Sequence, residues 1–489
     1  MSEVILGLDL GTSSLKGIFI GAHGEILAKH EVALSLHRHG NDGDRVEQDA
    51  HEYISALREL IAQDLTTNGL IHHIKAIGLS GHTPSLVAVD ADGRATAPVM
   101  IWQDNRAIAE AEELAERFGD PREIIGTSLP WSPSTTAAKA FWIQRHQPDV
   151  AQKTRWLLQP KDFLGFALTG AAISDPWSTK GLCNVRTQRA LDEVLQLIGW
   201  DSSVVPELRD GFASRGQTTE SCTQRFGIPS GIPVSVGWSD AMCGMLALGA
   251  FSKPTSFIIT GTSAIVGTSS AHEPFDDQPL YLIPSGSAPY PVTFGPTQMS
   301  GGSISWAAHL FGISESELVA RGDADGSTHV PTYLPYIAGE RAPLWRSDIR
   351  GSFTNISIAH GAGAFARATM EGICFAERQV LELSQRLTNA QTTEIVLSGK
   401  AGNDPRWLAT RLRTMGQSLR VVDDVEITCR GAAILADTML TGNIAQSTAA
   451  LSLSGEVHQP TKSDIEYGQR NYNVFIEEQQ ALLAKSRKS

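Results

Sequence analysis

Two short turns of the same residue types stand at the ends of apolar runs, one in each half of the chain. The first is Leu10-Gly11-Thr12-Ser13-Ser14 and the second is Thr260-Gly261-Thr262-Ser263-Ala264. Backbone N–H groups and hydroxyls gathered in such a turn form a small concavity that suits phosphate oxygens. Two of these turns can clasp a polyphosphate from opposite sides, so the pattern predicts chemistry on a polyphosphate.

Two carboxylates accompany these turns. Asp9 ends the apolar run before the first turn, where an unpaired carboxylate would be costly and a divalent cation would remove the cost. Asp240 follows the apolar segment Val234–Val236 and is the candidate general base, since phosphoryl transfer to a hydroxyl needs a carboxylate that accepts its proton. A turn cap at Asp9 and a helix N-cap at Asp240 are the purely structural alternatives.

The elements that must position these residues follow from the apolar pattern. Short apolar runs predict strands over residues 4–8, 15–20, 26–34, 74–79 and 86–90. An amphipathic helix is predicted over 48–65, and the polar, glycine-bearing stretch 34–45 is predicted to be a surface loop. This order predicts an α/β fold with a mixed sheet.

The repeated turn also bears on the domain organisation. Thr262 stands 250 residues after Thr12, about half the chain later, and both turns lie between two predicted strands. A similarity of five residues can arise by chance, but both segments lie between two predicted strands, which favours a duplication into two related lobes.

Composition narrows the class of protein. The chain has 489 residues, with 53 acidic and 40 basic side chains and a net charge of −13. An acidic balance without a basic face argues against nucleic-acid binding. Five scattered cysteines predict reduced thiols in a cytoplasmic protein. No apolar stretch approaches the ~20 residues of a membrane helix, so no membrane partner is expected.

Together these residues resemble the FGGY family of carbohydrate kinases, within the actin-like ATPase superfamily. Residues 7–14 are similar to the family's first phosphate motif and residues 259–264 to its second. Residues 134–143 resemble the first family signature, with Ala140 where a larger apolar residue is usual, and residues 336–343 begin the second signature region.

The resemblance implies an α/β fold of two ribonuclease-H-like, actin-like ATPase lobes with a catalytic cleft between them. The N-terminal lobe, residues 1–245, is expected to hold the sugar site, the first phosphate motif and the base. The C-terminal lobe, residues 246–489, is expected to hold the second phosphate motif and the adenosine site. ATP and Mg²⁺ are the implied cofactors, a small sugar and ATP the implied partners, and a homodimer is compatible with the family.

The resemblance also implies roles for single residues. Asp240 is the catalytic base and contacts the sugar, and Asp9 is the carboxylate near the metal ion. The implied nucleotide contacts are Thr12, Ser13, Thr262, Gly301, Gly399 and Asn403. Lys400 stands where the family's adenosine loop carries another glycine, so the adenine pocket of this chain departs from the family pattern.

The substrate is the least determined part of the prediction. Residues 80–85 occupy the position where xylulokinases carry Met-His and glycerol kinases Arg-Glu, and this chain has neither pair. His82, Thr83 and Asp104 are predicted to line the sugar pocket, with turn or capping roles as the alternative for each. We predict an ATP-dependent sugar kinase with D-xylulose as the leading substrate. Another ketose, a polyol or an aldonic acid such as gluconate stays open, and a non-metabolic actin-superfamily ATPase is the alternative from another class.

Overall fold

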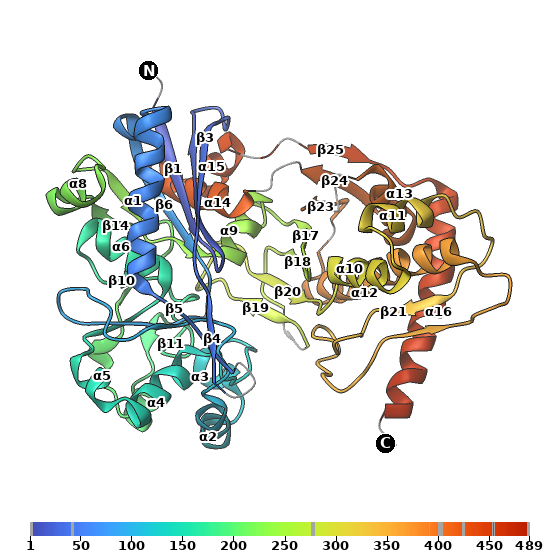
Figure 1. Cartoon of the computed structure of the whole chain (residues 1–489), viewed down its shortest axis with the longest axis horizontal. Coiled ribbons are helices and arrows are strands. Elements are labelled where there is room, and N and C mark those ends of the chain that lie inside the picture. The colour runs from blue at the N-terminus through green and yellow to red at the C-terminus, as the bar shows by residue number, and fades with distance from the viewer. Residues whose placement is uncertain are drawn as a thin grey trace. The chain divides into compact units, whose positions relative to one another are not determined.

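The computed structural model describes residues 3–40, 44–274, 279–390, 392–399, 404–422, 426–451, 453 and 455–486. The chain forms two compact units (Figure 1). The first unit comprises Met1–Ser252, Ile283–Pro289 and Glu426–Ser452, and the second comprises Lys253–Leu282, Tyr290–Val425 and Leu453–Ser489. Both units are therefore assembled from stretches that are not continuous in sequence. The predicted division into lobes at residues 245 and 246 stays a prediction.

The first unit is built on a sheet with the strand order β14-β15-β6-β1-β2-β3, and β16 also pairs with β6. Its strands are β1 (Val4–Leu10), β2 (Ser14–Ile20), β3 (Ile26–Ala33), β6 (Ile74–Gly81), β14 (Ser214–Gln217), β15 (Pro233–Ser235) and β16 (Trp238–Ser239). The first three strands form antiparallel hairpins, whereas β6 runs parallel to β1. All seven residues of β1 are buried, which agrees with the apolar run that predicted this strand.

Helices α1 (Ala50–Thr67) and α14 (Ile427–Thr441) pack against this sheet. Leu6 and Leu8 of β1 join α1 in one hydrophobic core, whereas a Cβ at Gly7 would meet the carbonyl of Cys429 in α14. Because successive side chains of a strand point to opposite faces, α1 and α14 cover opposite faces of β1. Asp9 lies two residues after Gly7 in β1, so its side chain points to the same face of the sheet, toward α14. Figure 1 shows α14, drawn in orange, beside the blue strands of the N-terminus.

The second unit repeats the same arrangement on a sheet with the order β19-β20-β18-β17-β23-β24-β25. Its strands are β17 (Ser256–Thr260), β18 (Ala264–Ser269), β19 (Tyr281–Ile283), β20 (Val292–Pro296), β23 (Glu394–Ser398), β24 (Ser418–Val422) and β25 (Gly455–His458). As in the first unit, a hairpin (β17 and β18) is joined by a parallel strand (β23) beside its first member. The helices α10 (Gly301–Phe311), α12 (Ala362–Thr388) and α13 (Pro405–Met415) contribute to its core. The shared strand order supports the duplication inferred from the two turns.

The predicted strands all form, but the segment before α1 differs from the prediction. The expected loop 34–45 contains β4 (His37–His39), and Gln48, the expected start of the helix, lies in β5 (Arg45–Gln48). Asp49 caps α1 by accepting the N–H of His51. Strand β5 pairs with β4 and with β8 (Val99–Met100), and a partner some fifty residues away leaves no trace in the local apolar pattern.

Among the described residues, no helix has the length and apolar character that crossing a bilayer requires.

Candidate active site

The two Gly-Thr-Ser segments are hairpin turns in both units. Gly11 N–H donates to the carbonyl of Ser14 at 3.0 Å, and Gly261 N–H donates to the carbonyl of Ser263 at 2.8 Å. The next two N–H groups of each turn, those of Thr12, Ser13, Thr262 and Ser263, donate to no acceptor among the described residues. Each turn therefore presents free backbone donors of the kind that bind phosphate oxygens.

Asp9 is held from both sides at the end of β1. The residue is 7% exposed; Oδ1 accepts a hydrogen bond from Ser80 Oγ and Oδ2 one from Thr428 Oγ1, both at 2.7 Å. Burial raises the pKa of Asp9 above its usual value, although the two hydroxyls and the charge of Lys16 oppose the shift. The carboxyl group is thus fixed in orientation, and its surroundings only partly stabilise its charged form.

Asp240 is the first residue of α9 (Asp240–Ala247), directly after β16. The helix cap is Ser239, which accepts the N–H of Met242, so the capping role considered for Asp240 belongs to its neighbour. Asp240 Oδ1 accepts the N–H of Ala241 at 2.7 Å. Burial, and secondarily the negative charge of Asp9, raises the pKa of Asp240 to about 7. A carboxylate with this pKa is suited to accept a proton near neutral pH.

Sheet topology brings the two carboxylates to the same edge. Asp9 is in register with Ser80 of β6, and Ser80 is in register with Trp238 of β16. Neighbouring strands are ~4.8 Å apart, so two strand spacings put the backbone of Asp9 roughly 10 Å from that of Trp238. Gly237 makes this approach feasible, because its φ of +86° and its contact with the carbonyl of Leu79 leave no room for a Cβ.

Lys180 supplies a positive charge near Asp240. Its Nζ donates to the carbonyl of Trp177 at 3.0 Å and lies 4.8 Å from the centre of the Trp177 ring. Burial lowers the pKa of Lys180 to about 8, and the charges of Asp175 and Asp240 oppose that shift. Trp177 O is its only hydrogen-bond acceptor within the part of the chain that is described, so two ammonium hydrogens stay available.

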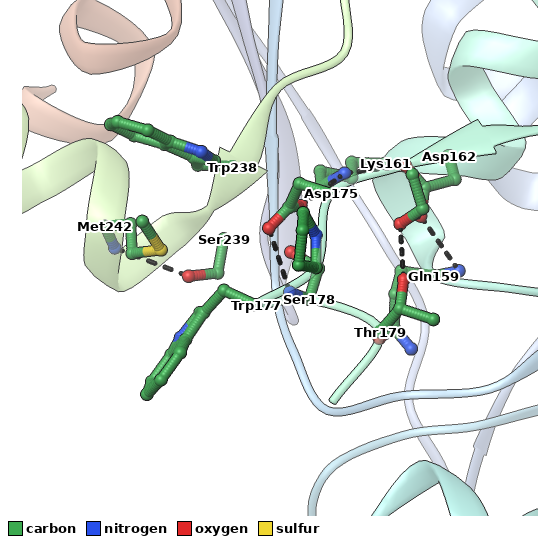
Figure 2. A network of polar contacts seen from close by, with 12 residues as sticks. Gln159, Lys161, Asp162, Asp175, Trp177, Ser178, Thr179, Trp238, Ser239 and Met242 are labelled. Carbon is green, nitrogen blue, oxygen red and sulfur yellow. Dashed lines mark hydrogen bonds and ion pairs between the residues drawn. The ribbon is translucent and has the colours of Figure 1, made fainter. Parts of the chain in front are cut away.

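A buried polar network supports the segment that carries Lys180 (Figure 2). Lys161, which is fully buried, lies between Asp162 and Asp175, with Nζ–Oδ1 distances of 2.6 and 2.9 Å. Asp175 also accepts the N–H of Ser178 at 2.9 Å, which fixes the start of the turn that leads to Lys180. These buried ion pairs and hydrogen bonds restrict the orientation of Asp175 and of the turn that follows it.

The residues predicted for the sugar differ in their surroundings. His82 is buried beside the carbonyl of Leu10; Nδ1 contacts Ser85 Oγ at 2.9 Å, and Nε2 has no hydrogen-bond partner among the described residues. Thr83 is half-buried. Asp104 is fully buried and its oxygens accept hydrogen bonds from Val46 N–H and from Arg106. The orphaned nitrogen of His82 fits a ligand hydroxyl, whereas Asp104 is engaged in holding β5.

Of the residues predicted to contact the nucleotide, Thr12 and Ser13 lie in the first unit, whereas Thr262, Gly301 and Gly399 lie in the second. Gly301 N–H donates to the carbonyl of Gly261 at 3.0 Å, so the start of α10 rests on the second phosphate turn. Gly399 follows β23 with a φ of +105°, and a Cβ there would lie 2.3 Å from the carbonyl oxygen of Thr260. Asn403 lies outside the described residues. Thr262, Gly301 and Gly399 therefore lie on neighbouring segments of one sheet edge.

Three further residues of this site have roles that the sequence did not predict, although Ser80 lies in the segment 80–85 that occupies the position of the family's substrate pairs. Thr428 reaches Asp9 from a helix more than four hundred residues later, and Ser80 reaches it from the next strand. Lys180 stands five residues after Asp175 in a stretch for which the sequence predicted no role.

Comparisons with known proteins agree with this architecture. The model of the FGGY family of carbohydrate kinases, N-terminal domain, matches residues 4–247, and that of the C-terminal domain matches residues 256–439. A xylulose kinase of Bacillus subtilis (strain 168) is 27% identical over 453 residues, 89% of this chain and 88% of the relative. A gluconokinase of the same organism is 24% identical over 97% of this chain and 94% of the relative.

The fold is likewise that of solved sugar kinases. The crystal structure of a xyloylose kinase from Brucella ovis superposes with a TM-score of 0.90 at 24% identity, covering 99% of this chain and 100% of that one. The predicted α/β fold of two actin-like lobes is confirmed. Kinases of this kind use ATP as a substrate and an alcohol group as the phosphate acceptor. The chain belongs to the FGGY family of carbohydrate kinases.

Proposed function

We propose that this kinase transfers the γ-phosphate of ATP to a hydroxyl of D-xylulose, with Asp240 as the base. The relatives named xylulose kinase support this substrate, and the gluconokinase supports an aldonic acid as the second candidate. The observation that carries the proposal is the juxtaposition of Asp240, whose pKa is raised to about 7, with Asp9 at one sheet edge of the first unit. The catalytic cleft between the lobes stays a prediction.

The proposed reaction is an in-line displacement. Asp240 accepts the proton of the sugar hydroxyl, and the oxygen forms a bond to the γ-phosphorus while the bond to the bridging oxygen of ADP breaks. Thr12, Ser13 and Thr262 bind phosphate oxygens through their turns and oppose the charge that develops on them. His82 and Thr83 orient the sugar, with Nε2 of His82 as the hydrogen-bonding atom.

The residues around Asp9 fit a magnesium ion. Each oxygen of Asp9 accepts one hydroxyl hydrogen bond and keeps lone-pair capacity, and Asp240 places a second carboxylate nearby. Mg²⁺ in such sites is typically held by one or two carboxylates together with phosphates and water. We propose that Asp9 holds it, and that the bound ion supplies positive charge to the transferring phosphoryl group.

The rest of the nucleotide is assigned to the second unit. Gly301 and Gly399 support this assignment, because both bring backbone close to the second phosphate turn where a side chain would not fit. Asn403 and the adenine pocket stay predictions from the family resemblance.

A coupled assay of ADP release tests the proposal. Purified enzyme is screened with D-xylulose, other ketoses, polyols including glycerol, and gluconate, and we expect the highest kcat/KM with D-xylulose. The variant Asp240→Ala is expected to lose roughly 10²–10⁴-fold in turnover while it still binds ADP. Asp92→Ala, which removes an exposed carboxylate of the same unit, is the control.

Near-normal turnover of Asp240→Ala would contradict the role of the base. ADP release that no sugar, polyol or aldonate stimulates would favour the non-metabolic ATPase. A higher kcat/KM with gluconate than with any ketose would replace xylulose by the aldonic acid.

Two further predictions complete the proposal. All five cysteines are buried and free, which supports a cytoplasmic, reducing location.

The homodimer stays a prediction that light scattering of the purified protein will test.

A further inference from the structure

We propose that Ser300 and Glu377 are positioning residues that hold the second phosphate turn in its nucleotide-binding geometry. The inference rests on the proposed function, because it takes the turn Gly261–Ser263 to contact nucleotide phosphates. It concerns a chain of contacts that runs from this turn through Ser300 to a buried ion pair formed by Glu377 and Arg411.

The first link joins the phosphate turn to the start of α10. The N–H groups of Ser300 and Gly302 donate to the carbonyl of Thr262 at 2.8 and 3.0 Å, and that of Gly301 donates to the carbonyl of Gly261 at 3.0 Å. These bonds direct the carbonyls of Gly261 and Thr262 toward α10 and leave the N–H groups of Thr262 and Ser263 free. The start of α10 therefore fixes the orientation of the peptide units that are proposed to bind phosphate.

The second link joins α10 to α12 through the side chain of Ser300. Ser300 is the N-cap residue of α10, yet its hydroxyl makes no capping bond, and its backbone has φ −119° and ψ −98°. Oγ instead donates to Glu377 Oε1 at 2.8 Å, with both residues buried. A serine at this position ordinarily caps its own helix, so the hydroxyl here serves a contact between elements.

The third link is the ion pair that holds the carboxylate of Glu377 in place. Arg411 of α13 contacts both carboxylate oxygens, Nη1 to Oε2 and Nη2 to Oε1, the latter at 3.3 Å. Both side chains are fully buried, and the guanidinium lies 5.1 Å from the centre of the Trp407 ring. Helix α13 begins at Pro405, shortly after Gly399. The ion pair thus connects the segment behind the phosphate turn with the helix that follows the predicted adenosine segment.

Stability alone does not account for this pair. Two buried charges pay a desolvation cost, and replacing such a pair by apolar residues of similar size is often neutral or stabilising. Unlike an apolar side chain, the carboxylate of Glu377 accepts a hydrogen bond from the Ser300 hydroxyl, and Arg411 fixes the position of that carboxylate. The geometry points to orientation of the turn as the role of the pair.

The test separates orientation from stability by measuring nucleotide and sugar binding independently. For Ser300→Ala we expect the Kd of ADP, measured by calorimetry, and the KM of ATP to rise roughly three- to tenfold. The KM of the sugar is expected to stay within about twofold of the wild type. Ser384→Ala is the matched control, because Ser384 is also buried, lies on α12 and donates its hydroxyl to the carbonyl of Thr293. It is expected to leave both nucleotide constants unchanged.

A double variant, Glu377→Leu with Arg411→Leu, addresses the ion pair directly. We expect a melting temperature equal to or above that of the wild type together with the weakened ADP binding of Ser300→Ala. Wild-type ADP affinity in this folded double variant would overturn the inference.

Gly301→Val distinguishes failure of this inference from failure of the site assignment, because a Cβ at Gly301 would already lie 2.7 Å from the carbonyl oxygen of Gly261. If Gly301→Val weakens ADP binding and Ser300→Ala does not, only the positioning role is overturned. If both variants fold and bind ADP normally, the nucleotide assignment of this turn is wrong and the positioning role is overturned with it.

Discussion

The surroundings of Asp240 and Lys180 shift the pKa of each side chain toward neutral pH. Burial and the charge of Asp9 raise the pKa of Asp240 to about 7, and burial lowers the pKa of Lys180 to about 8. Each charge stabilises the other, because Lys180 lowers the pKa of Asp240 and Asp240 raises that of Lys180. The proposed base must be ionised before it can accept the proton of the sugar hydroxyl, so its ionisation depends on a neighbouring cation whose own pKa is about 8.

The first prediction concerns the pH dependence of the reaction. kcat/KM for the sugar should rise with pH through about 7, as Asp240 loses its proton. Lys180→Met removes a charge that favours the ionised carboxylate, so the acid limb should move to higher pH. At pH 6.5 we expect the variant to lose roughly threefold in kcat/KM beyond any loss at pH 8.5. Lys180→Arg keeps the positive charge, so the acid limb of its pH profile should coincide with that of the wild type. An acid limb that does not move in Lys180→Met would show that Lys180 does not affect the pKa of Asp240.

At the scale of elements, close backbone packing determines where Asp9 finds its partners. A Cβ at Gly7 would lie 2.1 Å from the carbonyl oxygen of Cys429, and one at Gly78 would lie 1.8 Å from that of Ala432. Glycine at both positions allows α14 to pack directly on the backbone of β1 and β6. That contact brings Thr428, at the first turn of α14, within hydrogen-bonding distance of Asp9.

The second prediction follows from this contact. Gly78→Ala forces α14 away from β6, so the free energy of unfolding measured in urea should fall by roughly 1–3 kcal/mol. The displacement of Thr428 should also weaken the sugar kinase activity of the folded variant. Gly326→Ala, where a Cβ would meet nothing within 4 Å, should change neither quantity. A Gly78→Ala variant as stable as that control would contradict the close packing.

At the scale of the whole molecule, the first unit is completed by residues from the C-terminal part of the chain. The segment Glu426–Ser452, which carries α14 and α15 (Ile444–Leu451), belongs to the first unit although it follows most of the second. The face of β1 and β6 that α14 covers is buried only when this late segment is present. The first unit is consequently complete only when nearly all of the chain has been synthesised.

The third prediction tests this dependence with fragments. Residues 1–252 alone should expose the face of β1 and β6 and should aggregate or unfold without a cooperative thermal transition. The same fragment with residues 426–452 joined by a glycine-serine linker should regain a cooperative transition, followed by circular dichroism. A cooperative transition in the short fragment would mean that α14 is dispensable for this unit.

The sequence by itself determined the local parts of this protein. The two Gly-Thr-Ser turns, the strands on either side of them and the position of Asp240 after an apolar run follow from patterns of a few residues, because turn chemistry and apolar alternation act over that range. The repeat of one turn after 250 residues indicated the duplication, and the two matching strand orders support it.

Only the tertiary structure decided which side chains surround those parts. Thr428 donates a hydrogen bond to Asp9, the charge of Lys180 lowers the pKa of Asp240, and Ser300 donates to Glu377 across elements that lie dozens to hundreds of residues apart. The residues between such partners place no constraint on the spacing, so no local pattern records the pairing. It arises from strand order, from the face to which each strand residue points, and from glycines that let helices approach the sheet.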